Sequence, residues 1–252
     1  MLCRGVKPLA IDLFCGLGGW TEGLLAEGWR VVGLDIEEHV YGDHRYPADL
    51  MLRDVRTVHG SLFRDAHLIV ASPPCQEYSY MAMPWTKAKV KAAAVQSSGA
   101  ERRRLNELFN ECFRIQREAS KAAGRHIPLI VENVRGAQPW VGRARAKYGS
   151  FYLWGDVPTP LPPIASVEGV KVRSEDSGRR TDVGKGARFT SRDCGMEGTK
   201  QGGDWFAEAR KGGTGGTSES FGSKSPARRF ASAMIAKIPL PLSRHIGSAF
   251  KP

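Results

Sequence analysis

The chain has 252 residues and a formal net charge of +11 at pH 7. This length is enough for one domain with a sizeable core, or for one domain with a small appendage. The charge favours a polyanionic partner such as nucleic acid, although a merely basic surface would give the same balance. The five cysteines follow neither a CxxC nor a Cys/His ligand spacing, which argues against a disulfide framework and against a metal site.

No segment of the sequence predicts a membrane or secreted protein. No apolar run approaches the roughly 20 residues that a membrane span needs. The first five residues, Met-Leu-Cys-Arg-Gly, lack the apolar core of a signal peptide. We therefore expect no membrane partner and a cytoplasmic location.

The first predicted strand covers residues 9–14, and a glycine-rich turn at residues 15–19 follows it. A helical pattern over residues 20–26 begins directly after this turn. Glycines in such a turn let the backbone approach a ligand closely, and the N–H groups at the helix start stay available to it. Strand, glycine turn and helix in this order are typical of nucleotide-binding units.

The next predicted strand, residues 30–34, ends in an acid, Asp35. In nucleotide-binding folds an acid at this place usually holds the ribose hydroxyls. Asp54 and Val55 come after a turn-rich stretch, and a further strand follows at Leu68–Ala71. Strands that alternate with helices predict an open, mostly parallel sheet of the α/β class. Solvated loop acids remain the alternative for Asp35 and Asp54.

Residues 72–76, Ser-Pro-Pro-Cys-Gln, place a cysteine in a rigid turn after this strand. Leu68–Ala71 is a continuous apolar run with β-branched residues, which predicts a central parallel strand. The carboxyl ends of such strands face the site region of an α/β sheet. Cys75 is therefore a candidate nucleophile, and a small buried hydrophobe is the alternative.

Three motifs in a fixed order resemble a known family. They are DLFCGLGG at residues 12–19, PCQEYS at residues 74–79 and ENV at residues 132–134. In this order they resemble the S-adenosylmethionine, nucleophile and proton-donor motifs of the cytosine-C5 DNA methyltransferases. The resemblance covers about residues 8–155, and more loosely a helix that we expect over residues 226–238. It implies a Rossmann-like methyltransferase fold of the α/β class, with a mostly parallel sheet. The family usually has a larger target-recognition domain, whereas here we expect only a small irregular C-terminal recognition region.

The resemblance implies S-adenosylmethionine as the cofactor. The loop from Phe14 to Gly19 would wrap its methionine part, Asp35 would take the ribose and Ile36 would pack on adenine. Asp54 and Val55 would read the adenine edge. The full set of expected cofactor residues is Asp12, Phe14, Cys15, Gly16, Leu17, Gly18, Gly19, Asp35, Ile36, Asp54, Val55 and Pro74.

The expected chemistry explains why a cysteine and an acid are needed. Cytosine C5 is a poor nucleophile, and attack of a thiolate on C6 converts the ring into an enamine-like species that can take a methyl group. Only the thiolate attacks, so Cys75 must be partly ionised. Glu132 follows the apolar residues 128–131 and could lie beside Cys75, where its carboxyl group would bond to N3 of the ring. Asn133 would orient the turn, and a capping role is the alternative for Glu132.

Two arginines precede an apolar strand expected over residues 148–154. They resemble the paired-arginine motif of the family, in which Arg145 would contact the cytosine carbonyl and Arg143 a phosphate. If this stretch is extended, both side chains point to one face. The family usually has a helix and a strand before this motif, whereas here only residues 135–142 intervene. Surface arginines are the alternative, and Arg145 completes the expected catalytic set with Cys75, Glu132 and Asn133.

Duplex DNA hides C6, so such an enzyme acts on an extruded base or a single strand. A basic stretch over residues 87–125 follows the nucleophile turn and can neutralise phosphates without reading sequence. A solvated helix face is the alternative for its arginine run, because apolar residues at helix spacing lie behind it. The residues expected to contact nucleic acid are Gln76, Ser79, Arg102, Arg103, Arg143, Arg179 and Arg180.

The sequence divides into three parts. Residues 1–158 form the expected catalytic domain. Residues 159–225 are rich in Gly, Ser, Arg and Lys, cannot build much core, and are either a small recognition region or a flexible segment. Residues 226–252 would return a helix to the catalytic domain, with helical spacing up to the Pro-Leu-Pro at residues 239–241.

We therefore predict a DNA cytosine-C5 methyltransferase that acts on double-stranded DNA as a monomer, with a cognate restriction endonuclease as an optional partner. Methylation of RNA is one alternative, because transfer-RNA relatives share the motifs. A cytosine-N4 amino methyltransferase is another, since Ser72-Pro73-Pro74 fits its pattern until Cys75 takes the place of an aromatic residue. A basic DNA-binding protein without turnover is the alternative outside the enzymes.

Overall fold

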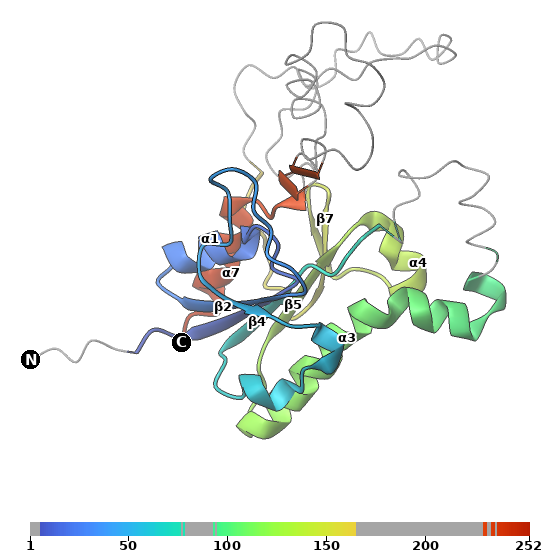
Figure 1. Ribbon diagram of the computed structural model, residues 1–252, viewed down its shortest axis with the longest axis horizontal. Coiled ribbons are helices and arrows are strands. Elements are labelled where there is room, and N and C mark those ends of the chain that lie inside the picture. The colour runs from blue at the N-terminus through green and yellow to red at the C-terminus, as the bar shows by residue number, and fades with distance from the viewer. Residues whose placement is uncertain are drawn as a thin grey trace, which may run out of the picture.

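The computed structural model describes residues 6–76, 78, 93, 95–164, 229–230, 233–234 and 236–252. Its centre is a seven-stranded sheet of order β3-β2-β1-β4-β5-β7-β6 (Figure 1). The strands are β1 Leu9–Leu13, β2 Arg30–Asp35, β3 Asp49–Leu52, β4 Leu68–Ala71, β5 Leu129–Asn133, β6 Ala146–Tyr148 and β7 Phe151–Gly155. The α-helices are α1 Gly19–Ala26, α3 Gly99–Ala123, α4 Gln138–Val141 and α7 Leu240–Ala249. Short 3-10 helices are η1 Val55–Thr57, η2 Gly60–Phe63 and η4 Arg135–Ala137.

Strands β1 to β5 pair in parallel, and β7 pairs antiparallel with both β5 and β6. From β1 the chain moves outward through β2 and β3, and then returns to β4 on the other side of β1. In open α/β sheets such a reversal of strand order leaves a crevice at the carboxyl ends of the strands, where ligands bind. The carboxyl ends of β1 and β4 carry the glycine turn and the Cys75 turn, so the topology brings these two turns together.

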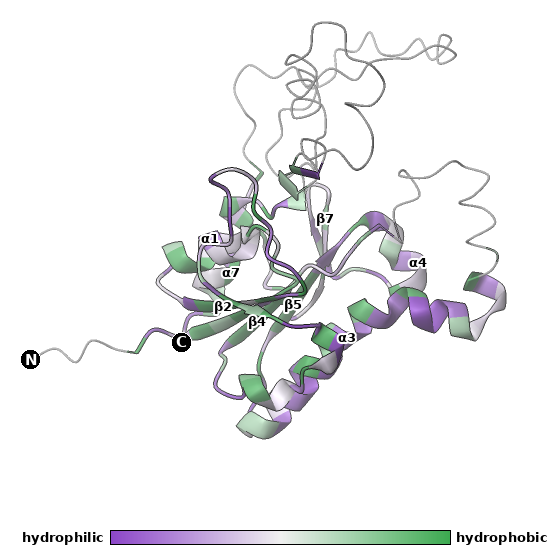
Figure 2. Ribbon diagram, in the orientation of Figure 1, coloured by the Kyte–Doolittle hydropathy of each residue, from purple (hydrophilic) through white to green (hydrophobic). Residues whose placement is uncertain are grey.

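Two hydrophobic cores lie on opposite faces of the sheet, and β4 contributes to both. Leu68 and Val70 belong to the core under α1 and α7, whereas Ile69 and Ala71 belong to the core under α3. This alternation follows from the two-residue period of a strand. Figure 2 shows the apolar colouring concentrated on the central strands between these helices. Because β4 is buried on both faces, all of its residues are apolar. This continuous apolar run is the sequence signal that predicted the strand.

Helix α7 packs on α1 and is an element that the sequence did not predict. The predicted helix over residues 226–238 lies largely outside the described residues, and α7 begins at the Pro-Leu-Pro where we expected the helical pattern to stop. Proline is compatible with the first turn of a helix, because the N–H it lacks has no partner there. The indole Nε1 of Trp29, in the loop between α1 and β2, donates to the carbonyl of Gly247 at 2.9 Å and holds α7 against this loop.

Two further elements differ from the prediction. The single strand expected over residues 148–154 is a hairpin, in which β6 and β7 are joined by a two-residue turn with Gly149 at φ 57°. Strand β3 was not predicted. The expected recognition region lies outside the described residues from residue 165 to residue 225. Within the described residues no helix is long and apolar enough to span a bilayer.

Candidate active site

The glycine turn after β1 is held in an unusual backbone conformation. Phe14 has φ 56°, a left-handed value that is rare for a bulky residue and costs about 1–3 kcal/mol. Gly16 and Gly18 also have left-handed values, 50° and 77°. A Cβ built on Gly16 would meet no described atom within 4 Å, so the space beside this residue is open to a ligand.

Asp35, at the end of β2, holds the glycine turn in place through a hydrogen bond from its backbone. Its carboxylate accepts a hydrogen bond from the Gly16 N–H at 2.9 Å and another from the Ile36 N–H at 2.8 Å. The Nε2 of His39 lies 3.8 Å from the same carboxylate. Burial alone would raise the pKa of Asp35, but the contacts with His39 and with the two N–H groups outweigh it and lower the pKa. Asp35 is therefore a carboxylate at neutral pH.

Asp54 caps η1 beside β2. Its side chain accepts from the N–H and the Nε of Arg56, and the Arg56 Nη2 donates to its second oxygen at 2.6 Å. Hydrogen bonds from Arg56 lower the pKa of Asp54. The next residue, Val55, is 3% exposed and packs in the hydrophobic core under α3. This packing fixes the position of the backbone next to Asp54.

Hydrogen bonds with side chains from α1, β5 and α3 hold the Cys75 turn in place. Trp20 Nε1 donates to Ser72 Oγ at 3.0 Å, and Asn133 Nδ2 donates to the Pro73 carbonyl at 3.0 Å. On the far side the Tyr78 hydroxyl lies 3.1 Å from Asn106 Oδ1, on α3. Because Asn133 follows Glu132 in β5, the bond to Pro73 also fixes Glu132 relative to Cys75.

A cavity of about 590 Å³ opens where these turns meet. This volume is within the range of small-molecule sites. Cys75 and Glu132 both line it, and Glu132 is 3% exposed. The predicted residues that line the cavity are Phe14, Cys15, Gly16, Leu17, Gly19, Asp35, Ile36, Asp54, Val55, Pro74, Cys75, Gln76 and Glu132.

The three described cysteines differ in their environment. Cys15 and Cys112 are buried, and burial raises the pKa of both thiols well above the ordinary value. Neither thiol would supply a thiolate at neutral pH. Cys75 is partly exposed and faces the cavity. Among the described cysteines, the position of Cys75 is the one suited to a nucleophile.

The family model for C-5 cytosine-specific DNA methylases matches residues 9–139. The chain belongs to this family. The predicted Rossmann-like methyltransferase fold is thereby confirmed, since the sheet is α/β and mostly parallel. No curated protein matches the chain.

Three solved structures are similar over about half of this chain. A protein described as a DNA modification methyltransferase from a prophage (E. coli) is 21% identical, with a TM-score of 0.35, over 52% of this chain and 33% of that chain. The S. pombe Dnmt2 methyltransferase is 14% identical, with a TM-score of 0.33, over 54% and 37%. The Entamoeba histolytica methyltransferase EhMeth is 13% identical, with a TM-score of 0.34, over 54% and 41%. The matched part of this family member thus spans only about a third to two fifths of those chains.

Several residues that the sequence predicted for the site do not line the cavity. Asp12 is 1% exposed beneath the glycine turn, where it accepts a hydrogen bond from Thr21 at 2.7 Å. Gly18 and Asn133 shape the two turns from behind. Arg102, Arg103, Arg143 and Arg145 are exposed, and their contacts with nucleic acid stay predictions. Ser79, Arg179 and Arg180 lie outside the described residues.

The structure adds site residues that the sequence did not single out. Trp20 and Ser72 line the cavity and are hydrogen-bonded to each other, and Arg53, Arg56 and Lys237 line it as well. The buried indole of Trp20 resembles any core residue in the sequence, so only the fold reveals its contact with Ser72. Within the described residues no group of three His, Cys, Asp or Glu side chains could hold a metal ion.

Proposed function

We propose that this protein methylates C5 of cytosine in DNA, with S-adenosylmethionine as the methyl donor and Cys75 as the covalent nucleophile. One observation supports the proposal above all others. Cys75 and Glu132 line the same cavity as the glycine turn and Asp35. The expected nucleophile and proton donor therefore share one space with the expected cofactor residues.

The residues of the glycine turn fit the cofactor. Open space beside Gly16 would admit the methionine part, and the strained Phe14 marks a turn whose conformation is maintained for binding. The Asp35 carboxylate keeps acceptor capacity beyond its two backbone bonds, which the ribose hydroxyls would use. Ile36 is 69% exposed at the cavity and would be covered by adenine. When bound, S-adenosylmethionine supplies an electrophilic methyl group.

Cys75 and Glu132 would then act together on the target base. The Cys75 thiolate adds to C6 while Glu132 holds a proton at N3, so that the electron pair released from the C5–C6 bond makes C5 nucleophilic. C5 would take the methyl group as the bond from the methyl carbon to the sulfonium sulfur breaks, with S-adenosylhomocysteine as the leaving group. Loss of the C5 proton to solvent water would then expel the Cys75 thiolate and restore the aromatic ring. The fixed position of Glu132 beside the Cys75 turn means that little reorganisation is needed during the reaction.

The basic surface near the cavity supports a polyanionic substrate. Arg102 and Arg103 are exposed on the first turns of α3, which follows the Cys75 turn in the chain. Arg53 and Arg56 line the cavity itself. Arg102 and Arg103 would hold phosphates of the strand that carries the extruded base.

Mass spectrometry of nucleosides tests this proposal. The purified protein is incubated with S-adenosylmethionine and either duplex DNA or transfer RNA. We expect 5-methylcytosine from DNA. Exclusive formation of 5-methylcytidine in RNA, or of N4-methylcytosine in DNA, would assign the protein to a rival reaction, and bound DNA without any product would indicate a binding protein.

A further inference from the structure

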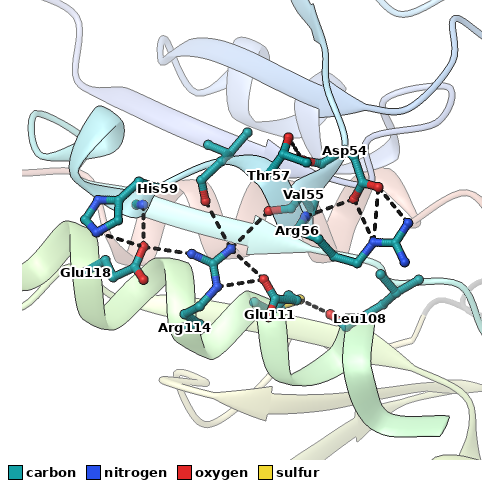
Figure 3. Close-up of polar contacts among 12 residues, drawn as sticks. Asp54, Val55, Arg56, Thr57, His59, Leu108, Glu111, Arg114 and Glu118 are labelled. Carbon is teal, nitrogen blue, oxygen red and sulfur yellow. Dashed lines mark hydrogen bonds and ion pairs between the residues drawn. The ribbon is translucent and has the colours of Figure 1, made fainter. Parts of the chain in front are cut away.

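Helix α3 contacts the turn at η1 through a cluster of charged side chains (Figure 3). Figure 3 shows Arg114 reaching from α3 between Glu111 and Glu118 toward the backbone of η1. Arg114 Nε donates to Glu111 at 2.6 Å, and Nη1 donates to Glu118 at 2.8 Å. The spacing of these residues, three before and four after the arginine, places all three on one face of the helix.

The remaining donor of Arg114 is directed at the main chain. Its Nη2 donates to the carbonyl of Val55 at 3.0 Å and to that of Val58 at 3.0 Å. These carbonyls lie at the start of η1 and just after its end. A 3-10 helix of three residues has few hydrogen bonds of its own, so an external donor of this kind determines its position.

Glu118 holds the same segment from a second direction. Its Oε2 accepts from the Gly60 N–H at 2.6 Å as well as from Arg114. Burial would raise the pKa of Glu118, but the bonds from Gly60 and Arg114 outweigh it and lower the pKa. The guanidinium therefore lies between two carboxylates, which keep it oriented toward the Val55 and Val58 carbonyls.

The turn held in this way forms part of the cavity wall. Asp54, Val55 and Arg56 all line the cavity. Asp54 caps the turn, and its main-chain carbonyl accepts from the Thr57 N–H at 2.9 Å. Any shift of the Val55 carbonyl therefore moves the Asp54 carboxylate relative to Asp35, on the neighbouring strand.

We propose that Arg114 is a cofactor-positioning residue, which holds the Asp54–Val55 turn where it receives the adenosyl part of S-adenosylmethionine. This inference rests on the proposed function. Arg114 itself is outside the cavity lining and acts through the main chain of η1. Its contribution belongs to cofactor binding and not to the chemistry at Cys75.

Substitution of Arg114 by lysine tests the inference. Lysine keeps the charge but cannot hold two carboxylates and two carbonyls in one planar fork. For Arg114→Lys we expect the dissociation constant of S-adenosylmethionine, measured by calorimetry, to rise about tenfold, which corresponds to about 1.4 kcal/mol. The kcat at saturating cofactor should stay within about twofold of wild type, because the hydrogen bonds from Trp20 and Asn133 to the Cys75 turn come from α1 and β5.

Arg125→Lys is the matched control. Arg125 also donates to a main-chain carbonyl across the fold, that of Ala66 at 2.6 Å, but Ala66 precedes β4, at the end of the sheet away from the cavity. This variant should leave the affinity for S-adenosylmethionine unchanged. Hydrogen exchange at residues 55–60 should become faster in Arg114→Lys and stay unchanged in Arg125→Lys.

A second variant, Glu111→Gln, tests the same role if Arg114→Lys folds poorly. Glu111→Gln removes one carboxylate beside the guanidinium, and we expect a smaller rise, about threefold, in the dissociation constant. Equal affinities for wild type and both variants would overturn the role of Arg114, as would a fall in kcat at unchanged affinity. If the wild-type protein bound no S-adenosylmethionine at all, the proposed function would fail together with this inference.

Discussion

The glycine turn after β1 and the Cys75 turn after β4 occupy equivalent places at neighbouring strand ends, but they are held in different ways. The glycine turn depends on its own backbone, with left-handed conformations at Phe14, Gly16 and Gly18. The Cys75 turn depends on hydrogen bonds from side chains far away in the sequence, such as Asn133. The conformation of the first is set mainly by its own residues, together with Asp35 at the end of β2, whereas the second also needs β5 and α3 in place.

This difference separates the two expected roles. The glycine turn, with Asp35 beside it, forms the expected cofactor site. A turn fastened from β5 and α3 keeps Cys75 in register with Glu132, which is what covalent chemistry on one base requires. Changes to one turn should therefore alter cofactor affinity, and changes to the other should alter turnover.

The largest effect is expected from Cys75→Ala. Without the thiol no covalent addition to C6 can occur, so transfer of labelled methyl groups from S-adenosylmethionine to DNA should fall below detection. The affinity for the cofactor, measured by calorimetry, should stay within about twofold, since the expected cofactor contacts come from the glycine turn, Asp35 and the Asp54–Val55 turn. A folded variant that had lost cofactor binding would contradict the separation of roles.

Glu132→Gln should slow turnover by about a hundredfold, in the usual range for loss of a positioned proton donor. The amide has nearly the same shape, so DNA affinity and cofactor affinity should both be retained. Single-turnover kinetics with saturating DNA measures this effect. An unchanged rate would show that the proposed bond to N3 does not exist.

Gly18→Ala should weaken cofactor binding at least about tenfold and lower the free energy of unfolding by about 1–3 kcal/mol. Gly18 has φ 77°, and a Cβ there would lie 2.6 Å from Cδ of Pro47. Gly124→Ala is the control, because Gly124 has φ 65° at the end of α3 and open space around it. That variant should lose stability through its backbone alone, with cofactor affinity intact.

Asn133→Ala should reduce kcat by about tenfold, because a displaced Cys75 turn is misaligned with the base. Loss of the buried bonds to Pro73 and Val134 should also lower the free energy of unfolding by about 1–3 kcal/mol. Ser120→Ala removes a comparable bond, from the Ile127 N–H at 3.0 Å, far from the turn. If both variants lowered kcat equally, the decrease would reflect general destabilisation.

The last prediction is a pH dependence of the free energy of unfolding, which arises beneath the glycine turn. Burial, more than the nearby charge of Asp35, raises the pKa of Asp12 to about 8 despite a hydrogen bond from Thr21. The unfolded chain ionises Asp12 near pH 4, from its ordinary pKa of 3.8, so Asp12 stabilises the fold at low pH and this stability is lost as pH rises from about 4 to about 8.

Asp12→Asn removes this titration. Urea unfolding at pH 5 and at pH 8 should show that the free energy of unfolding of wild type, relative to Asp12→Asn, is lower at the higher pH. A constant difference between the two proteins would show that Asp12 is ionised throughout this range.

The sequence predicted the elements whose signals are local. Strands β1 and β4 are continuous apolar runs, and their ends were predicted nearly as the structure has them. Helix α7 was missed because Pro239 and Pro241 indicate a helix end unless the following residues are known to pack on α1. The hairpin of β6 and β7 was missed because Tyr148 to Trp154 has the composition of one strand, and only the pairing of Tyr148 with Phe151 divides it.

The same distinction applies to the site. Phe14 to Gly19, Asp35, Cys75 and Glu132 could be chosen from motifs, and the structure places them around one cavity, except for Gly18 behind it. The bonds between Trp20 and Ser72, or between Arg114 and Val55, join residues more than fifty positions apart. No pattern within one segment indicates such contacts. They follow only from the order of the strands.

Covalent trapping tests the central claim most directly. In duplex DNA with fluorine at C5 of cytosine, no proton is left at C5 after methyl transfer, so the adduct with the enzyme cannot collapse. We expect wild-type protein with S-adenosylmethionine to form a complex with this DNA that survives denaturation, and Cys75→Ala to form none. Methylation of ordinary DNA without any trapped complex, or equal trapping by Cys75→Ala, would contradict the role of Cys75 as the nucleophile.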